Sequence, residues 1–188
     1  MALLQASNLE VFSLTVSDGG KWSTSPALSG HAIKRCGKIY MLVGSPNDAT
    51  IVYVGQTISA IATRFHGGFR AKARYKYQWS VRRGSYQLFV WDLSAYSASR
   101  SLLEAVEAEL VLGARIAQKG WPKYQTGIHF RHLVDHRGRQ IAPRLAIEMM
   151  GHFYDHAGTR DDPRDSKALD QERELVISQM EKLILPGS

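Results

Sequence analysis

The sequence predicts an α+β domain built on a small antiparallel sheet, and three observations carry this prediction. Two short runs rich in β-branched and aromatic residues, Lys38–Val43 and Thr50–Val54, are separated by the polar turn Ser45-Pro46-Asn47-Asp48. Runs joined in this way pair as an antiparallel hairpin. A third strand is expected at Tyr86–Leu93, and long segments with apolar residues at helical spacing follow it. The order hairpin, helix, strand, helix indicates an α+β arrangement.

The segments on either side of the hairpin are shorter. Val11–Val16 alternates enough to form a strand, whereas Lys21–Gly30 is rich in Ser, Gly and Pro and is expected to be a loop. After the hairpin, Thr57 can cap a helix that runs from Ile58 to about His66, and Gly67-Gly68 stops it. The hairpin is therefore followed at once by a short helix.

Three longer helices are expected in the second half of the chain, from Ser101 to about Lys119, from Ile141 to His156 and from Asp165 to Leu185. The first opens with the capping-box spacing Ser101-x-x-Glu104 and ends at Gly120-Trp121-Pro122. The last carries an apolar stripe, which is interpreted either as a surface packed on the domain or as a dimer surface. The stripe consists of Leu169, Val176, Met180, Leu183 and Ile184.

Length and composition fit one globular domain. With 188 residues the chain is long enough to bury a core, and no apolar run approaches the roughly 18–20 residues that span a bilayer. The start, Met1–Glu10, lacks the basic and apolar regions of a signal peptide. We therefore expect a cytoplasmic protein with no membrane partner. The single cysteine, Cys36, excludes an internal disulfide and any zinc site made of several cysteines.

The formal net charge of +7 and the pI of about 9.6 favour a polyanionic partner. The charge is concentrated in one stretch that contains no acid, and three aromatic residues, Tyr75, Tyr77 and Trp79, interleave it. Cations contact phosphates and aromatic rings stack on bases, so this stretch is the predicted DNA-binding element. A solvated basic loop with buried aromatics is the alternative. The cations proposed to bind DNA are Arg70, Lys72, Arg74, Lys76, Arg82 and Arg83.

Four residues in order along the chain can together cleave a phosphodiester: Tyr40, Tyr53, Arg64 and Glu107. Hydrolysis needs an activated water and charge relief at the phosphorus oxygens. The planar guanidinium of Arg64 suits phosphate oxygens, and the carboxylate of Glu107 suits Mg²⁺ or Mn²⁺. A phenol titrates near pH 10 in water, so either tyrosine needs a nearby positive charge to act as base. His66 is the alternative base, because it needs no such help.

This set resembles the catalytic core of the GIY-YIG nuclease family. Lys38-Ile39-Tyr40 stands in the GIY place and Tyr53-Val54-Gly55 in the YIG place. The resemblance covers roughly residues 37–125, and it implies a three-stranded antiparallel sheet flanked by helices. Residues 1–36 would then form an N-terminal extension with one extra strand. Residues 126–188 would form a helical extension packed on the core.

The resemblance also implies roles for particular residues. Glu107, in Glu107-Ala108-Glu109-Leu110-Val111, fits the family's Glu-x-x-Leu-Ile pattern and would be the metal ligand. Tyr40 would assist the attacking water. Glu109, on the other flank of the same apolar ridge, is the alternative carboxylate, and ordinary surface glutamates are the remaining interpretation. Pro122-Lys123-Tyr124-Gln125 is similar to the family's Pro-x-Tyr-Asn ending with Gln125 in the asparagine place, and Lys38 replaces the glycine of GIY.

The function that this implies is a Mg²⁺- or Mn²⁺-dependent endonuclease acting on double-stranded DNA. The chain has no recognisable separate DNA-binding module, which makes it most similar to the stand-alone restriction endonucleases of the family. Recognition of a palindrome would require a homodimer with one active site for each strand. A phage or mobile-element nuclease with loose specificity is the first alternative. A nucleic-acid-binding domain without cleavage activity is the second, because the sequence departs from the family pattern at Lys38 and Gln125.

Overall fold

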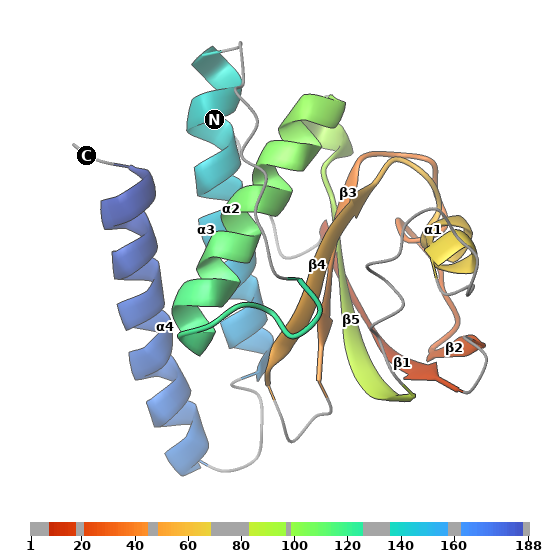
Figure 1. Cartoon of the computed structure of the whole chain (residues 1–188), viewed down its shortest axis with the longest axis horizontal. Coiled ribbons are helices and arrows are strands. Elements are labelled where there is room, and N and C mark those ends of the chain that lie inside the picture. Colours follow the sequence, from red (N-terminus) through yellow and green to blue (C-terminus); the bar gives the residue numbers. More distant parts are fainter. Residues whose placement is uncertain are drawn as a thin grey trace.

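The computed structural model describes residues 8–17, 21–44, 49–68, 83–96, 99–125, 136–157 and 163–185. These residues form an α+β fold with one antiparallel sheet and four α-helices (Figure 1). The strands are β1 (Leu9–Val16), β2 (Trp22–Ser25), β3 (Lys38–Val43), β4 (Ile51–Thr57) and β5 (Gly84–Asp92). The helices are α1 (Ile61–Gly68), α2 (Arg100–Gln118), α3 (His136–Ala157) and α4 (Pro163–Ile184).

The sheet has five strands in the order β2-β1-β5-β3-β4, and not the three strands expected. The three predicted strands do lie together, because β3 pairs with both β4 and β5. The strand at the N-terminus then pairs along the whole of β5. The segment expected to be a loop contains β2, which pairs with β1 from Ser13↔Ser25 to Val16↔Trp22. Trp22 explains the error, since its ring packs edge-on against Phe65 at 5.4 Å and holds this short strand on the sheet.

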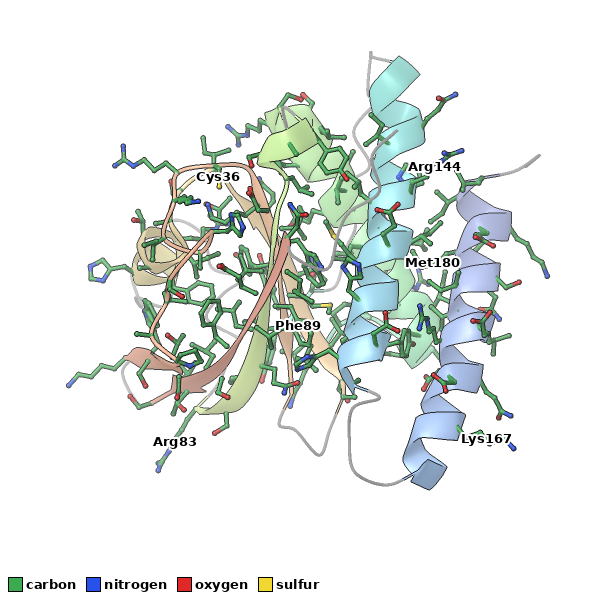
Figure 2. All side chains as sticks on the ribbon, turned by 180° about the vertical axis from the view of Figure 1, so that it is seen from behind. Cys36, Arg83, Phe89, Arg144, Lys167 and Met180 are labelled. Carbon is green, nitrogen blue, oxygen red and sulfur yellow. The ribbon has the colours of Figure 1, made fainter. Side chains whose placement is uncertain are left out.

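One face of the sheet is covered by α2 and α3, and α4 packs on the outside of these two helices (Figure 1). Alternate strand residues point to this face, among them Ile39, Met41 and Phe89. Figure 2 shows Phe89 between the sheet and the helices, and Met180 on the inner side of α4. This is the larger of the two cores.

The opposite face is covered by α1 and by the segment that precedes β3 (Figure 1). The strand residues in between point here, and Tyr40 and Leu42 of β3 pack with Ile61 and Phe65 of α1. The two predicted catalytic tyrosines belong to this second core. The alternation of the strands therefore places both tyrosines on the face away from the long helices.

Two helix starts differ from the prediction. Helix α1 begins at Ile61, not at Ile58, because β4 continues to Thr57, whose hydroxyl accepts a hydrogen bond from the Ser59 amide at 3.0 Å. Helix α2 is capped by Ser99 and not by Ser101, since the Ser99 hydroxyl accepts from the Leu102 amide at 3.2 Å. Glu104 consequently forms an i,i+4 ion pair with Arg100 in place of the expected capping box.

The end of α2 has a non-glycine residue in the left-handed region. Lys119 closes the helix with a φ of 53°, while its amide donates to Ile116 and that of Gly120 donates to Arg115. Glycine is the usual residue at such a position, and a side chain there costs roughly 1–2 kcal/mol. In the described part of the chain Lys119 is the one non-glycine residue with a positive φ.

The predicted apolar stripe of the last helix is only partly buried. Val176 and Met180 are buried against the core, whereas Leu183 is 65% exposed. The Leu169 side chain lies outside the described residues. Only the side of α4 that meets α2 and α3 is covered, because the helix lies at the outside of its layer (Figure 1). None of the described helices is long and apolar enough to cross a membrane.

Candidate active site

Tyr40 and Tyr53 lie next to each other on neighbouring strands. Tyr40 is opposite Gly55 and Tyr53 is opposite Leu42, so the two rings are diagonal neighbours with centroids 6.0 Å apart. The glycine of Tyr53-Val54-Gly55 has a steric cause here. A Cβ on Gly55 would come within 2.6 Å of the Tyr40 ring and within 2.8 Å of the Tyr53 ring. The ring of Tyr40 can cross β4 only because Gly55 has no side chain.

Arg64 is brought to the tyrosines by α1. Phe65, the next residue, is fully buried and packs edge-on against Tyr40 at 5.6 Å between ring centroids. This packing fixes the rotation of the helix, and Arg64 Nε then donates to the Tyr40 hydroxyl oxygen at 3.3 Å. A guanidinium and a phenol from two separate elements therefore meet at one point.

Glu107 belongs to the same site, although α2 lies on the other face of the sheet from α1 (Figure 1). Burial raises the pKa of Glu107 to about 7, while the charge of Arg64 acts to lower it and that of Glu104 to raise it. The charge of Arg64 is therefore within electrostatic range of this carboxylate. Helix α2 packs against β4, which is the edge strand of the sheet. The site is therefore located at this edge, where the two faces meet.

Glu109 has a different environment from Glu107. Burial also raises the pKa of Glu109 to about 7, but the shift is caused by burial alone, with no contribution from Arg64. Two residues along a helix are separated by about 200° around its axis, so the two carboxylates point in different directions. The geometry favours Glu107 over Glu109 as the site carboxylate.

Gln125 stabilises β4, the strand that carries Tyr53. Its side-chain oxygen accepts from the Val54 amide at 3.0 Å, and the Tyr124 amide donates to the Val52 carbonyl at 3.0 Å. The segment that leaves α2 thus runs along the outer edge of β4 (Figure 1). These bonds satisfy backbone groups that an edge strand would otherwise leave open, on both sides of Tyr53.

Two further predicted residues, His66 and Arg83, are not brought to this point. His66 is exposed and lies two residues, or about 200°, around α1 from Arg64. Arg83 is exposed at the start of β5, roughly 20 Å along the strand from Val90, the partner of Tyr40. Figure 2 shows Arg83 and Cys36 at opposite ends of the sheet. Four predicted DNA-binding residues, Arg70, Lys72, Arg74 and Lys76, lie outside the described residues, as does Arg82.

Three buried polar residues that lie next to the tyrosines on the same face of the sheet were not expected from the sequence. Lys38, Thr57 and Asp92 are buried and lie opposite one another on β3, β4 and β5. Lys38 Nζ donates to the carbonyl oxygens of Lys34 at 2.6 Å and Cys36 at 3.0 Å. The departure from the family's glycine thus has a structural role, since Lys38 holds the segment before β3. A lysine in a short strand gives no sequence signal of such burial.

Asp92 and Glu10 complete this support. Burial alone would raise the pKa of Asp92, but hydrogen bonds from Ser94 and Cys36 hold it below its usual value. Glu10 accepts from the amides of His31 and Ala32, both at 2.9 Å. The Ala32 carbonyl in turn accepts from the amide of Ile61 at 2.9 Å, at the first residue of α1. These contacts connect the sheet to the helix that presents Arg64.

The donors at the site suit one kind of metal ion. No group of three or more His, Cys, Asp or Glu side chains that could hold a metal ion occurs among the described residues. Zinc and calcium need such groups, whereas Mg²⁺ is commonly held by one or two carboxylates, water and substrate phosphate. A buried carboxylate with a raised pKa would also gain from a cation beside it. The residues present therefore fit Mg²⁺ or Mn²⁺ on Glu107.

No family model matches this chain, and no curated protein or solved structure matches it either.

Proposed function

We propose that this chain is a Mg²⁺-dependent endonuclease of the GIY-YIG type that hydrolyses phosphodiester bonds in double-stranded DNA. One observation carries the proposal. Arg64 donates to Tyr40, whose ring packs beside Tyr53, and the charge of Arg64 also acts on the carboxylate of Glu107. A phenol, a guanidinium and a carboxylate at one point are the groups that this hydrolysis requires.

Each residue has a distinct role in this proposal. Arg64 binds the phosphate oxygens and offsets the charge that develops on them. The Tyr40 oxygen accepts from Arg64, and as a phenolate it would take the proton of the attacking water. Tyr53 forms the neighbouring wall of the site. Glu107 would hold Mg²⁺, which supplies charge neutralisation and a more acidic bound water.

The structure also bears on the alternatives. A binding domain without cleavage was suggested by the departures at Lys38 and Gln125, but both residues have structural roles that leave the site intact. We therefore favour an active enzyme, and within the family a restriction endonuclease. A homodimer is part of the proposal if the recognition sequence is a palindrome.

The test is incubation with unmethylated phage DNA in Mg²⁺ or in EDTA, followed by electrophoresis. Discrete bands in Mg²⁺ alone support a restriction enzyme, and a Mg²⁺-dependent smear supports a nuclease of loose specificity. Intact DNA in both samples contradicts the proposed activity.

Substitutions at the site test which residues take part in cleavage. Arg64→Ala and Glu107→Gln are each expected to slow cleavage by about 10²- to 10³-fold, because each removes a charge used in the transition state. Tyr40→Phe should cost about 10²-fold or more if the phenol assists the water, with His66→Ala as the control that keeps normal cleavage. Normal cleavage by Tyr40→Phe with slow cleavage by His66→Ala would identify His66 as the base. Normal cleavage by Arg64→Ala would show that the proposed site is wrong.

A further inference from the structure

The segment that joins α2 to the edge of β4 carries exposed cations and aromatic rings that the proposed chemistry does not use. Between Glu109 and Gln125 the chain contains three basic residues and no acid. These residues, Arg115, Lys119 and Lys123, are all exposed. Two aromatic residues, Trp121 and Tyr124, lie among them, and Trp121 is 37% exposed.

Each ring is in contact with one of the cations. The Arg115 guanidinium lies over the Trp121 ring at 4.4 Å from its centroid, and the Lys123 ammonium lies 5.5 Å from the centroid of Tyr124. These contacts restrict the long cationic side chains while leaving them at the surface. A surface of restricted cations with aromatic faces is suited to a polyanion that also carries planar bases.

Lys119 gives an independent indication. It occupies the left-handed position at the end of α2, with a φ of 53°, where glycine would be less strained and where Gly120 is the very next residue. A backbone conformation that disfavours the residue present points to a role for its side chain. The proximity of the helix C-terminus favours a cation in general, but it does not require one at this particular residue.

The segment is also close to the candidate active site. Its end is fixed to β4 on both sides of Tyr53, through Tyr124 to Val52 and Gln125 to Val54, and Tyr124 packs on the core that contains Tyr40 and Tyr53. Gln125 is the sixth residue after Lys119, and these six steps of chain span at most roughly 20 Å. That length corresponds to about six phosphates of one DNA strand, at 3.4 Å of helix axis each. One duplex can thus contact both places.

We infer that Arg115, Lys119, Trp121 and Lys123 form a second DNA-contacting surface, which binds the backbone beside the phosphodiester that is cleaved. This surface rests on the proposed function and is separate from the basic stretch at residues 70–83. Lys119 and Lys123 contact phosphates, while Arg115 on Trp121 offers a phosphate contact beside a stacking face. Its role is to hold the duplex in register with Tyr53 and Arg64 without taking part in the chemistry.

The test uses Lys119→Gly, because glycine separates the fold from the binding. The melting temperature should be unchanged or higher, since glycine adopts this φ without strain. The Kd for a 25-base-pair duplex, measured by fluorescence anisotropy in EDTA, should rise roughly three- to tenfold. The slope of log Kd against log salt should fall by about 0.9 for each phosphate that the variant no longer neutralises. For Lys119→Gly/Lys123→Ala the slope should fall by about twice as much.

Two controls complete the design. Lys119→Arg keeps the cation at the same strained position and should bind DNA as the wild type does. Lys182→Ala removes an exposed cation from the last turn of α4, which is not part of this segment, and should leave both Kd and slope unchanged.

The outcomes separate this inference from the proposed function. If the wild type binds and cleaves DNA but Lys119→Gly/Lys123→Ala keeps the wild-type Kd and slope, the surface does not bind DNA and the nuclease proposal stands. A weaker Kd with an unchanged slope would also overturn it, because phosphates would then not be the partner. If the wild type neither binds nor cleaves any duplex, the proposed function itself fails.

Discussion

The two faces of the sheet differ in how the ionisable groups packed on them are accommodated. On the face covered by the long helices, burial lowers the pKa of the half-buried His152 and His156, which favours their neutral forms; His152 accepts from Trp91 and His156 packs on Phe89. On the face covered by α1, Lys38 and Asp92 are buried with polar partners supplied by the backbone and by side chains. Neutral groups need little support, whereas buried charges must be paired.

The difference bears on the position of the candidate site. The helical face is an apolar core that holds the sheet together. The other face uses polar contacts to fix α1 and the segment before β3, and the candidate site lies at the β4 edge between the two. Glu107 reaches this edge from the helical layer, and its raised pKa is the consequence of a carboxylate placed where burial is high and pairing is partial.

The largest expected effect comes from a matched pair of cavities. Leu110 and Leu42 are both fully buried, Leu110 in the helical core and Leu42 opposite Tyr53 in the other. Replacing either by Ala should lower the free energy of unfolding by about 2–5 kcal/mol, as measured by urea denaturation. Only Leu42→Ala should also slow cleavage by the folded protein, because the Leu42 side chain no longer supports Tyr53. Equal cleavage by the two variants would show that Leu42 does not support Tyr53 in the site.

A smaller effect is expected from pH, measured in EDTA. The pKa of Glu107 is about 7 when folded and 4.5 ordinarily, so between these values the folded state binds more protons and raising the pH lowers stability. The full shift is worth on the order of 3 kcal/mol. The free energy of unfolding of Glu107→Gln should therefore equal that of the wild type near pH 4.5. By pH 8 it should exceed the wild-type value by up to about 3 kcal/mol.

Glu109 provides the control for this pH effect, because burial raises its pKa to about 7 as well. As the pH rises, Glu109→Gln should also become more stable than the wild type, but by a smaller amount, because the Glu109 carboxyl is less enclosed. The variant should still cleave DNA normally. Loss of cleavage in Glu109→Gln with normal cleavage in Glu107→Gln would exchange the roles of the two carboxylates.

The smallest effect is expected at Gly55, which lies against the rings of Tyr40 and Tyr53. Gly55→Ala should destabilise the protein by about 1–3 kcal/mol, because its Cβ would overlap the rings of Tyr40 and Tyr53. Gly84→Ala is the matched control, since a Cβ at this position in β5 would be 3.5 Å from the Tyr86 side chain, an ordinary contact. Thermal unfolding of both variants measures the difference. Equal melting temperatures would show that the rings move aside at no cost.

The elements of the fold were largely predictable from local pattern. The hairpin, the third strand and the long helices follow from periodicity and turn residues, which act over a few positions. Strand β2 was missed because its four residues lie in a Ser- and Pro-rich segment and depend on Trp22 packing against Phe65. The start of α1 was placed early because Thr57 is a good cap by composition, while the pairing of Thr57 with Lys38 keeps it in the sheet.

By itself the sequence determined which residue types stand in which order: two tyrosines on paired strands, an arginine on the following helix and a glutamate on a later one. Only the tertiary structure decided which of them meet. Arg64, and not His66, donates to Tyr40, because Phe65 fixes the rotation of α1. The charge of Arg64 acts on Glu107, whereas the pKa of Glu109 is raised by burial alone. Such choices depend on contacts between residues far apart in the chain, and these contacts arise only when the two faces of the sheet are packed.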